Sequence, residues 1–280
     1  MMNFRLRTMT SEDIPVAMEL KDAAGWNQTA ADWDRFINAS PNGCFVMEYR
    51  GHVVGTSATI TYDGRCSWIG MLVVDEQYRG QGLGTALLER SIQFLDSQKI
   101  RTIKLDATPQ GKPLYEKLGF ISEYGIERWA LSRNAKGKGA ENVPVSIEDV
   151  LRIDRTVFGA NRNGLLISLA QEAPHLTLVD QQEGDVTGYS FGRLGSIADH
   201  MGPWVARDED AAERLLNSFL LRSSRELIFI DCLRLNPWAV ALVKARGFEF
   251  SRPLTRMFRG TNGDAGQVEL LCASVGPEFG

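Results

Sequence analysis

The chain contains two copies of one pattern, and this repetition constrains its fold more than any other feature. A helix start at Thr10 matches one at Ser146, an offset of 136 residues, and Gly119-Phe120 matches Gly247-Phe248, an offset of 128 residues. Two further features lie between these in the same order in both halves. Because chance would not place four features twice in one order, we infer an internal duplication.

Each copy is predicted to begin with a capped helix and an antiparallel hairpin. Thr10 and Ser146 each stand three residues before an aspartate, which is a helix N-cap signature. Residues 45–59 align without a gap with residues 178–192. Both segments have the pattern of two apolar strands around a turn that carries glycine.

Each copy then continues with two strand–helix units. The strands 69–74 and 204–206 each precede a helix with one apolar face. The strands 103–106 and 227–233 precede shorter helices that end in Gly-Phe, with glycine where a helix C-cap needs a left-handed residue. This order predicts an α/β fold (an α+β mixed sheet) in two tandem domains.

Length and linker composition place the domain boundary. The 280 residues divide into two units of about 140, an ordinary domain size. The segment 132–143 contains Lys136-Gly137-Lys138-Gly139, a polar and glycine-rich linker. We therefore predict domains at residues 1–135 and 143–280.

Composition excludes several classes of function. The net charge is −4, which argues against a nucleic-acid binder. No run of about 18 apolar residues occurs and the N-terminus lacks a signal-peptide pattern, so we expect no membrane partner and a cytoplasmic location. Four cysteines without C-x-x-C spacing and three unclustered histidines predict reduced thiols and no metal site.

The strongest chemical signal is the glycine-rich segment after strand 69–74, Gln77-Tyr78-Arg79-Gly80-Gln81-Gly82-Leu83-Gly84-Thr85. Alternate glycines let backbone N–H groups approach a ligand closely. The helix that starts near Leu83 adds its positive N-terminal end, and Arg79 can add charge-assisted hydrogen bonds. The segment therefore predicts a pyrophosphate site.

The glycine spacing separates this segment from two common nucleotide-binding loops. Neither Gly80 nor Gly82 begins a G-x-G-x-x-G motif, because Thr85 and Leu87 occupy the third positions. No G-K-[ST] follows, which excludes a P-loop. A nucleotide-dependent oxidoreductase is excluded on the same spacing.

The segment resembles the acyl-CoA pyrophosphate loop of the GCN5-related N-acetyltransferase (GNAT) superfamily. The resemblance rests on Gln77-x-x-Gly80-x-Gly82 with Gly84, and on Tyr115-Glu116-Lys117-Leu118-Gly119-Phe120, which resembles the Tyr-x-x-x-Gly-Phe helix end of that family. It covers the whole first half. The second half resembles the degenerate C-terminal domain of a tandem subgroup, including the closing residues 276–280.

The resemblance implies acetyl-CoA as co-substrate and a set of binding residues. Free backbone groups of the strand before the loop would hold the pantetheine arm, and the loop amides would hold the pyrophosphate. These residues are Leu72, Val73 and Val74, followed by Arg79, Gly80, Gln81, Gly82, Leu83, Gly84 and Thr85.

The resemblance also implies two catalytic residues. Tyr115 would protonate the departing CoA thiolate, and a phenol can supply that proton. Asp106, at the end of strand 103–106, is the candidate base that accepts the proton of the amine. The alternative is that Asp106 is a capping or solvated residue, and that Tyr115 only packs under the Gly-Phe turn.

The second half lacks the phosphate loop. Its corresponding segment is shorter and reads Arg207-Asp208-Glu209-Asp210, whose acidic residues would repel a pyrophosphate. Val243 stands where the first half has Tyr115. We expect this half to bind no CoA and to form one wall of the acceptor pocket.

These observations predict an enzyme that moves the acetyl group of acetyl-CoA to a primary amine by direct attack. The alternative is a non-catalytic acetyl-CoA sensor, which would need the loop but not the phenol of Tyr115. The acceptor stays open among a small amine, an amino acid, a polyamine and a protein N-terminus. Five aromatic residues fall where an acceptor pocket would form but are expected mainly in the core: Trp26, Trp33, Phe36, Tyr62 and Trp68.

Overall fold

The computed structural model describes residues 3–134, 146–263 and 266–280. The first half contains, in order, β1 (Phe4–Thr8), α1 (Ile14–Ala23), α2 (Ala30–Ala39), β2 (Cys44–Tyr49), β3 (His52–Tyr62), β4 (Cys66–Val74), α3 (Leu83–Ser97), β5 (Thr102–Ala107), α4 (Lys112–Lys117) and β6 (Ile121–Ser132). The helices and strands predicted for this half from local pattern are confirmed, from the hairpin β2–β3 to the helix that follows the glycine loop.

The second half repeats this order. It contains α5 (Ile147–Phe158), α6 (Asn163–Glu172), β7 (Leu178–Gln182), β8 (Asp185–Leu194), β9 (Asp199–Ala206), α7 (Glu209–Arg222), β10 (Leu227–Leu233), α8 (Ala239–Ala245), β11 (Glu249–Gly260) and the short β12 (Leu271–Ala273). The helices α4 and α8 are each followed by a glycine of positive φ, Gly119 at +86° and Gly247 at +80°. The sequence repeat is thus a repeat of structure.

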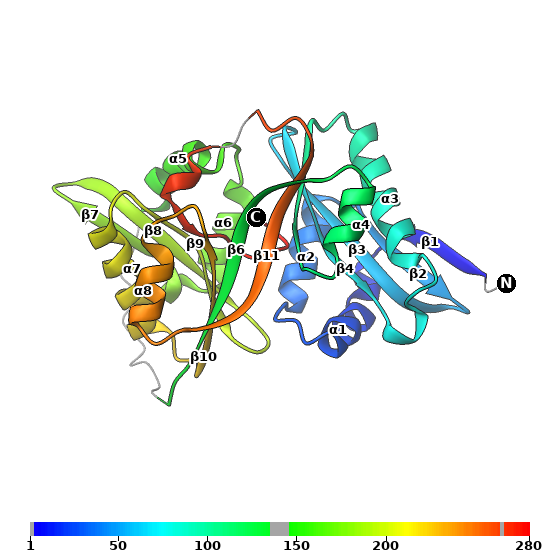
Figure 1. Ribbon diagram of the computed structural model, residues 1–280, viewed down its shortest axis with the longest axis horizontal. Helices are drawn as coiled ribbons and strands as arrows, with labels where there is room; N and C mark the ends of the chain where they lie inside the picture. The colour runs from blue at the N-terminus through cyan, green and yellow to red at the C-terminus, as the bar shows by residue number, and fades with distance from the viewer. Residues whose placement is uncertain (1–2, 135–145, 264–265) are drawn as a thin grey trace.

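Two of the long strands are exchanged between the halves. The described strands form one mixed sheet in the order β1-β2-β3-β4-β5-β11-β6-β10-β12-β9-β8-β7. The strand β11 of the second half pairs with β5 of the first, and β6 of the first half pairs with β10 of the second. Figure 1 shows β6 and β11 side by side where the halves meet. A mixed α/β fold is confirmed, and each half completes the sheet of the other.

Helices cover both faces of the first-half sheet. Cys44 and Val46 belong to the core cluster that includes Trp33 and Phe36 of α2. The intervening Phe45 and Met47 belong to a cluster with Leu83 and Leu87 of α3. Because successive side chains of a strand point to opposite faces, α2 and α3 lie on opposite sides of the sheet. This packing fixes the start of α3 at the end of β4.

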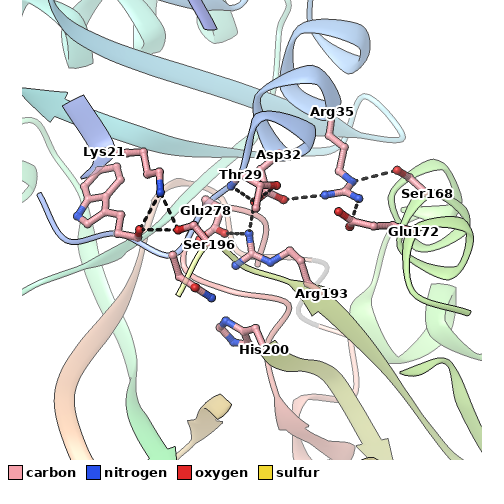
Figure 2. Close-up of polar contacts among 12 residues, drawn as sticks. Lys21, Thr29, Asp32, Arg35, Ser168, Glu172, Arg193, Ser196, His200 and Glu278 are labelled. Carbon is pink, nitrogen blue, oxygen red and sulfur yellow. Dashed lines mark hydrogen bonds and ion pairs between the residues drawn. The ribbon is translucent and has the colours of Figure 1, made fainter. Parts of the chain in front are cut away.

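A network of buried charges joins the halves (Figure 2). Asp32 of α2 accepts hydrogen bonds from Arg35 at 2.7 Å and from Arg193 of β8 at 2.9 Å. Arg35 also contacts Glu172 of α6 at 2.5 Å, and Arg193 forms an ion pair with Glu278 near the C-terminus. Moving the halves apart would separate these pairs and leave buried charges without partners, which is strongly unfavourable. The network therefore fixes how the halves sit against each other.

The last residues of the chain are also buried in this interface. Phe279 stacks on Phe36 of α2 with ring centroids 4.7 Å apart, and its carbonyl accepts a hydrogen bond from the Tyr62 hydroxyl at 2.8 Å. The carbonyl of Gly280 accepts one from Arg162 at 3.0 Å. The linker predicted at Lys136 to Gly139 lies outside the described residues, so the domain ranges stay a prediction. No helix in the described part of the chain is long and apolar enough to cross a membrane.

Candidate active site

The strands β4 and β5 separate along most of their length. They pair in parallel only at their starts, where Cys66, Ser67 and Trp68 oppose residues 102–104. From Ile69 onward β4 pairs only with β3. One side of residues 69–74 is therefore open, and these residues include the predicted ligands Leu72, Val73 and Val74.

A β-bulge shapes β4 at this opening. The register between β3 and β4 shifts between Thr56 and Ala58, and Met71 takes a φ of +56° there. The Thr56 hydroxyl donates a hydrogen bond to the carbonyl of Met71 at 2.7 Å. A non-glycine residue at positive φ is strained, and such strain gathers at functional sites. Sequence pattern gave no signal for this bulge.

The glycine loop lies between the end of β4 and the start of α3. Gly80 and Gly82 have φ values of +77° and +81°, which L-residues rarely adopt, and a Cβ at either position would meet no atom within 4 Å. The first backbone hydrogen bond of α3 runs from Ala86 to Gly82 at 3.0 Å. The amides of Leu83, Gly84 and Thr85 therefore precede the helical ladder and stay available to an anion.

The remaining predicted loop residues frame these amides. Arg79 is exposed, and its Nε donates to the carbonyl of Val74 at 3.1 Å. Gln81 is also exposed, whereas the side chain of Leu83 is buried in the core with Leu87. The loop thus offers backbone groups and one guanidinium to a ligand. This arrangement suits a pyrophosphate.

A cavity of about 130 Å³ lies against the opening between β4 and β5. Gly70, Met71 and Leu72 line it from β4, and Tyr115 lines it from α4. Trp26, Gln28, Arg252 and Glu278 also line it, and the backbone of Glu278 lies directly beside Gly70. The structure therefore brings the predicted pantetheine strand and the predicted acid to one cavity, and residues of the second half complete its wall.

Tyr115 combines packing with access to the cavity. Its ring meets Phe120 edge to face at 6.1 Å, and it lies so close to Gly111 that a Cβ there would come within 2.9 Å of the ring. Burial raises the pKa of Tyr115 to about 12. The phenol is therefore protonated at neutral pH and able to donate its proton.

Asp106 also lines the cavity, but its carboxylate is engaged by the exchanged strand. Nε and Nη2 of Arg256 each donate to one oxygen of Asp106 at 2.8 Å. Burial raises the pKa of Asp106, and the adjacent Arg256 charge opposes that rise. If Asp106 accepted a proton from an amine, its carboxylate would become neutral and the buried Arg256 charge would lose its partner. The geometry disfavours the role of base that we predicted for Asp106.

The duplication gives a second reason to regard Asp106 as structural. Asp231 of β10 and Arg128 of β6 form the corresponding pair in the other half, with two hydrogen bonds of 2.7 Å. The second half has no phosphate loop and yet keeps this pair. The two ion pairs therefore join the exchanged strands to their neighbours in both halves.

The corresponding opening in the second half is filled. The strands β9 and β10 pair in parallel at Asp199, His200 and Met201 and then separate, as β4 and β5 do. Strand β12 lies in the gap, where Leu271 pairs with Val205 and Ala273 pairs with Cys232. Because the chain itself occupies this space, no room remains there for a pantetheine arm.

The acidic segment that replaces the loop has a structural role. Asp208 caps α7 by accepting a hydrogen bond from the amide of Ala211 at 2.8 Å. Val243, the counterpart of Tyr115, is fully buried in the core of its half. Both observations agree with our expectation that this half binds no CoA, which stays a prediction.

Sequence reasoning missed two charged residues of the cavity wall, Arg252 and Glu278. Arg252 comes from the exchanged strand β11, and Glu278 comes from the C-terminal tail. The one sequence signal for them was the duplication, which predicted that the second half would form a wall of the acceptor pocket. Of the five aromatic residues set aside as core, Trp26 lines the cavity and the other four are buried. No group of three or more potential metal ligands occurs among the described residues.

Comparison with known families matches each half separately. A profile described as "Acetyltransferase (GNAT) family" matches residues 13–120, and one described as "Acetyltransferase (GNAT) domain" matches residues 150–270. The first match contains the glycine loop and Tyr115. The second covers the half whose opening is filled by β12.

Individual relatives match the chain over different shares of its length. Holothin acyltransferase from Pseudoalteromonas is 24% identical over 89% of this chain and 85% of its own length. The uncharacterized N-acetyltransferase YitH from Bacillus subtilis is 28% identical over 55% of this chain and 56% of its own length. The chain thus spans most of one relative and about half of the other.

Solved structures show the same fold along the whole chain. A putative acetyltransferase from Pyrococcus horikoshii superposes with a TM-score of 0.83 at 23% identity, over 99% of this chain and 96% of its own. A GCN5-related N-acetyltransferase from Sphaerobacter thermophilus gives a TM-score of 0.67 at 16% identity, over 92% and 95%. At these identities the likeness concerns the fold alone.

Proposed function

The chain belongs to the GNAT family of acetyltransferases, with two such domains in tandem, and we propose that its first half transfers an acetyl group from acetyl-CoA to a primary amine. The observation that carries this proposal is the continuous path along the open side of β4. This path begins at the glycine loop and ends at the cavity that Tyr115 lines.

Acetyl-CoA would lie along this path. Its pyrophosphate would accept hydrogen bonds from the amides at the start of α3, with Arg79 beside it. Its pantetheine arm would pair with the open backbone of Leu72, Val73 and Val74, as an added strand does. The acetyl group would then reach the cavity beside Tyr115. The acceptor would enter from the opposite side, between the segment at Trp26 and the second half.

The proposed transfer is a direct attack without an acyl-enzyme. The acceptor ammonium loses one proton, and the neutral nitrogen attacks the thioester carbonyl. As the C–N bond forms, the C–S bond breaks and its electron pair stays on sulfur. The Tyr115 hydroxyl gives its proton to that sulfur, and the second amine proton replaces it. The products are the N-acetyl amine, CoA with a free thiol and one released proton.

The alternative is a sensor that binds acetyl-CoA and transfers nothing. Tyr115 favours catalysis, because a sensor needs the glycine loop but gains nothing from a phenol beside the thioester. The cavity wall favours it too, since a sensor needs no charged residues on the acceptor side. Tyr115 belongs to the first half, and the charged residues of the wall line the same cavity as Tyr115.

The experiment that tests the proposal measures free thiol released from acetyl-CoA in the presence of amines. The panel contains amino acids, polyamines, amino sugars and short peptides with free N-termini. Amine-dependent thiol release by the full-length protein, lost in the Gly82→Val variant, is the expected result. Tight acetyl-CoA binding without thiol release for any amine would instead support the sensor.

A further inference from the structure

Arg252 is a half-buried arginine at the junction of the halves, and it differs from the buried arginines around it because it has no hydrogen-bond or ion-pair partner among the described residues. Its Nε is buried without a hydrogen bond, and its guanidinium forms no hydrogen bond or ion pair with any described residue. It lines the cavity from the exchanged strand β11. A buried donor without a partner costs free energy, so such groups in native structures call for an explanation.

The neighbouring arginines are all neutralised by carboxylates. Arg128 has Asp231, and Arg256 has Asp106. Arg193 lies between Asp32 and Glu278. Arg252 lines the cavity wall, and no carboxylate of the described residues meets it in a hydrogen bond or ion pair. Burial lowers the pKa of Arg252 and the nearby Arg128 charge lowers it further, whereas the Asp231 and Glu278 carboxylates partly oppose this shift. A guanidinium nevertheless stays charged at neutral pH.

Two polar acceptors lie on the same wall. Glu278 forms an ion pair with Arg193, and its carboxylate makes no hydrogen bond with any other described side chain. The side-chain oxygen of Gln28 is likewise buried without a donor. The wall thus presents a guanidinium without a hydrogen-bonded anion, an amide oxygen without a donor, and a carboxylate whose one cationic partner is Arg193.

A small zwitterion would satisfy this set of groups. A carboxylate matches the two-pronged geometry of a guanidinium, and an ammonium supplies three donors. The cavity of about 130 Å³ is similar in size to cavities of about 150 Å³ that hold one benzene ring, so it suits a small molecule. A polyamine offers no anion to Arg252 and would place a second cation beside it.

Within the function proposed above, on which this inference rests, we propose that the acceptor is a free amino acid whose carboxylate is bound by Arg252. The α-ammonium group then lies on the side of the cavity that carries Glu278 and Gln28. In this arrangement the second half, which lacks the CoA loop, supplies the residue that selects the acceptor. This gives the exchange of β11 a functional consequence.

The test compares matched acceptors with the full-length protein. Each of the twenty standard amino acids is assayed beside its carboxamide, which keeps the amine and side chain but lacks the carboxylate. We expect at least one amino acid to be acetylated with kcat/KM at least tenfold above that of its amide. For that acceptor, Arg252→Gln should raise KM by about 10- to 100-fold, the range expected for a charge-assisted bidentate contact, and change kcat little.

Three controls separate this role from a structural one. Arg259→Gln removes another arginine of β11, one that pairs with Asp96 outside the cavity, and should leave KM unchanged. Arg252→Lys keeps the charge and should recover part of the affinity. The KM of the amide should not respond to Arg252→Gln. Thermal unfolding of each variant shows whether the fold is retained.

Failure of this inference is distinguishable from failure of the proposed function. Transfer to amines that lack a carboxylate, at rates equal to or above those of amino acids, would overturn the acceptor assignment and leave the acetyltransferase intact. Unchanged KM in Arg252→Gln would do the same. If no amine in the panel releases thiol, amino-acid binding to the CoA complex is measured by calorimetry, and absence of binding would also overturn the assignment.

Discussion

Asp106 and Arg256 are joined by two hydrogen bonds of 2.8 Å across the boundary between the two halves. The duplication repeats this relationship with Asp231 and Arg128, at 2.7 Å. In each pair the aspartate lies on a strand that stays in its half, and the arginine lies on a strand that has crossed over. The exchange of β6 and β11 is therefore secured by one buried ion pair on each side.

The first prediction uses this symmetry to separate structure from catalysis at Asp106. Asp106→Asn and Asp231→Asn each leave a buried arginine without its anion and should lower the free energy of unfolding by about 3–5 kcal/mol. Chemical denaturation measures this loss. Because Asp106 is occupied by Arg256, we expect kcat per folded molecule to fall less than tenfold in both variants. A hundredfold fall in Asp106→Asn alone would restore Asp106 as the base.

The second prediction concerns the glycine loop. Gly82→Val places a branched side chain at a φ of +81° where the pyrophosphate would approach, so acetyl-CoA affinity should fall at least tenfold by calorimetry. Gly64→Val is the matched control, because Gly64 has a φ of +62° and equally empty surroundings but lies in the β3–β4 turn. Both variants carry similar backbone strain. Equal loss of affinity in the two would mean that strain, and not contact with the ligand, explains the effect.

The third prediction concerns Tyr115. Tyr115→Phe keeps the ring that packs on Phe120 and removes the proton donor, so kcat should fall ~10²- to 10⁴-fold with acetyl-CoA affinity little changed. The pKa of about 12 keeps the hydroxyl protonated below that pH, and its contribution is lost only as the pH rises through this value. The ratio of kcat between parent and variant should therefore stay constant from pH 6 to 10.

Two measurements check the assignment of Tyr115. Pre-steady-state release of thiol shows whether chemistry or product release limits turnover, since a slow release step would hide the loss. Tyr49→Phe, which removes a hydroxyl remote from the cavity, should leave kcat unchanged. A loss below threefold in the chemical step of Tyr115→Phe would make Tyr115 a packing residue.

Local pattern was sufficient for the elements that form the candidate site. The strand before the loop, the helix start at Leu83 and the Gly-Phe helix end each follow from neighbouring residues, because N-caps, glycine conformations and helical faces are local properties. The Met71 bulge was not predictable, since it depends on the register of β3 against β4. The prediction that the second half lacks the phosphate loop rested on residues 207–210. In the structure Asp208 of this segment caps α7.

The exchange of strands could not be predicted from the sequence. The strands β6 and β11 descend from one ancestral strand and share length, alternation and an arginine at the same place, so each fits beside β5 or β10. The alternation of apolar and polar side chains predicts which face of a strand is buried, but it does not predict which strand lies beside it in the sheet. For the same reason Arg252 and Glu278 could not be assigned to a cavity that the first half builds.

The last prediction tests the exchange directly with the fragments 1–135 and 143–280. The first fragment lacks β11, so the edge of β5 is open and Asp106 has no Arg256. The second lacks β6, so Asp231 has no Arg128. An exposed strand edge and an unpaired buried charge both oppose folding. We expect each fragment alone to fail to give a cooperative thermal transition by circular dichroism, and the two co-expressed fragments to purify as one complex that binds acetyl-CoA.

Charge reversal makes this test specific to the exchanged strands. Asp106→Arg in the first fragment should prevent the complex from forming, and Arg256→Asp in the second fragment should partly restore it, because the pair is re-formed with its signs inverted. Arg259→Asp on the same strand should restore nothing. The contrary outcome is a first fragment that alone unfolds cooperatively and binds acetyl-CoA as tightly as the whole chain. In that case β6 can pair with β5 in place of β11, and the exchange is not required for the CoA site.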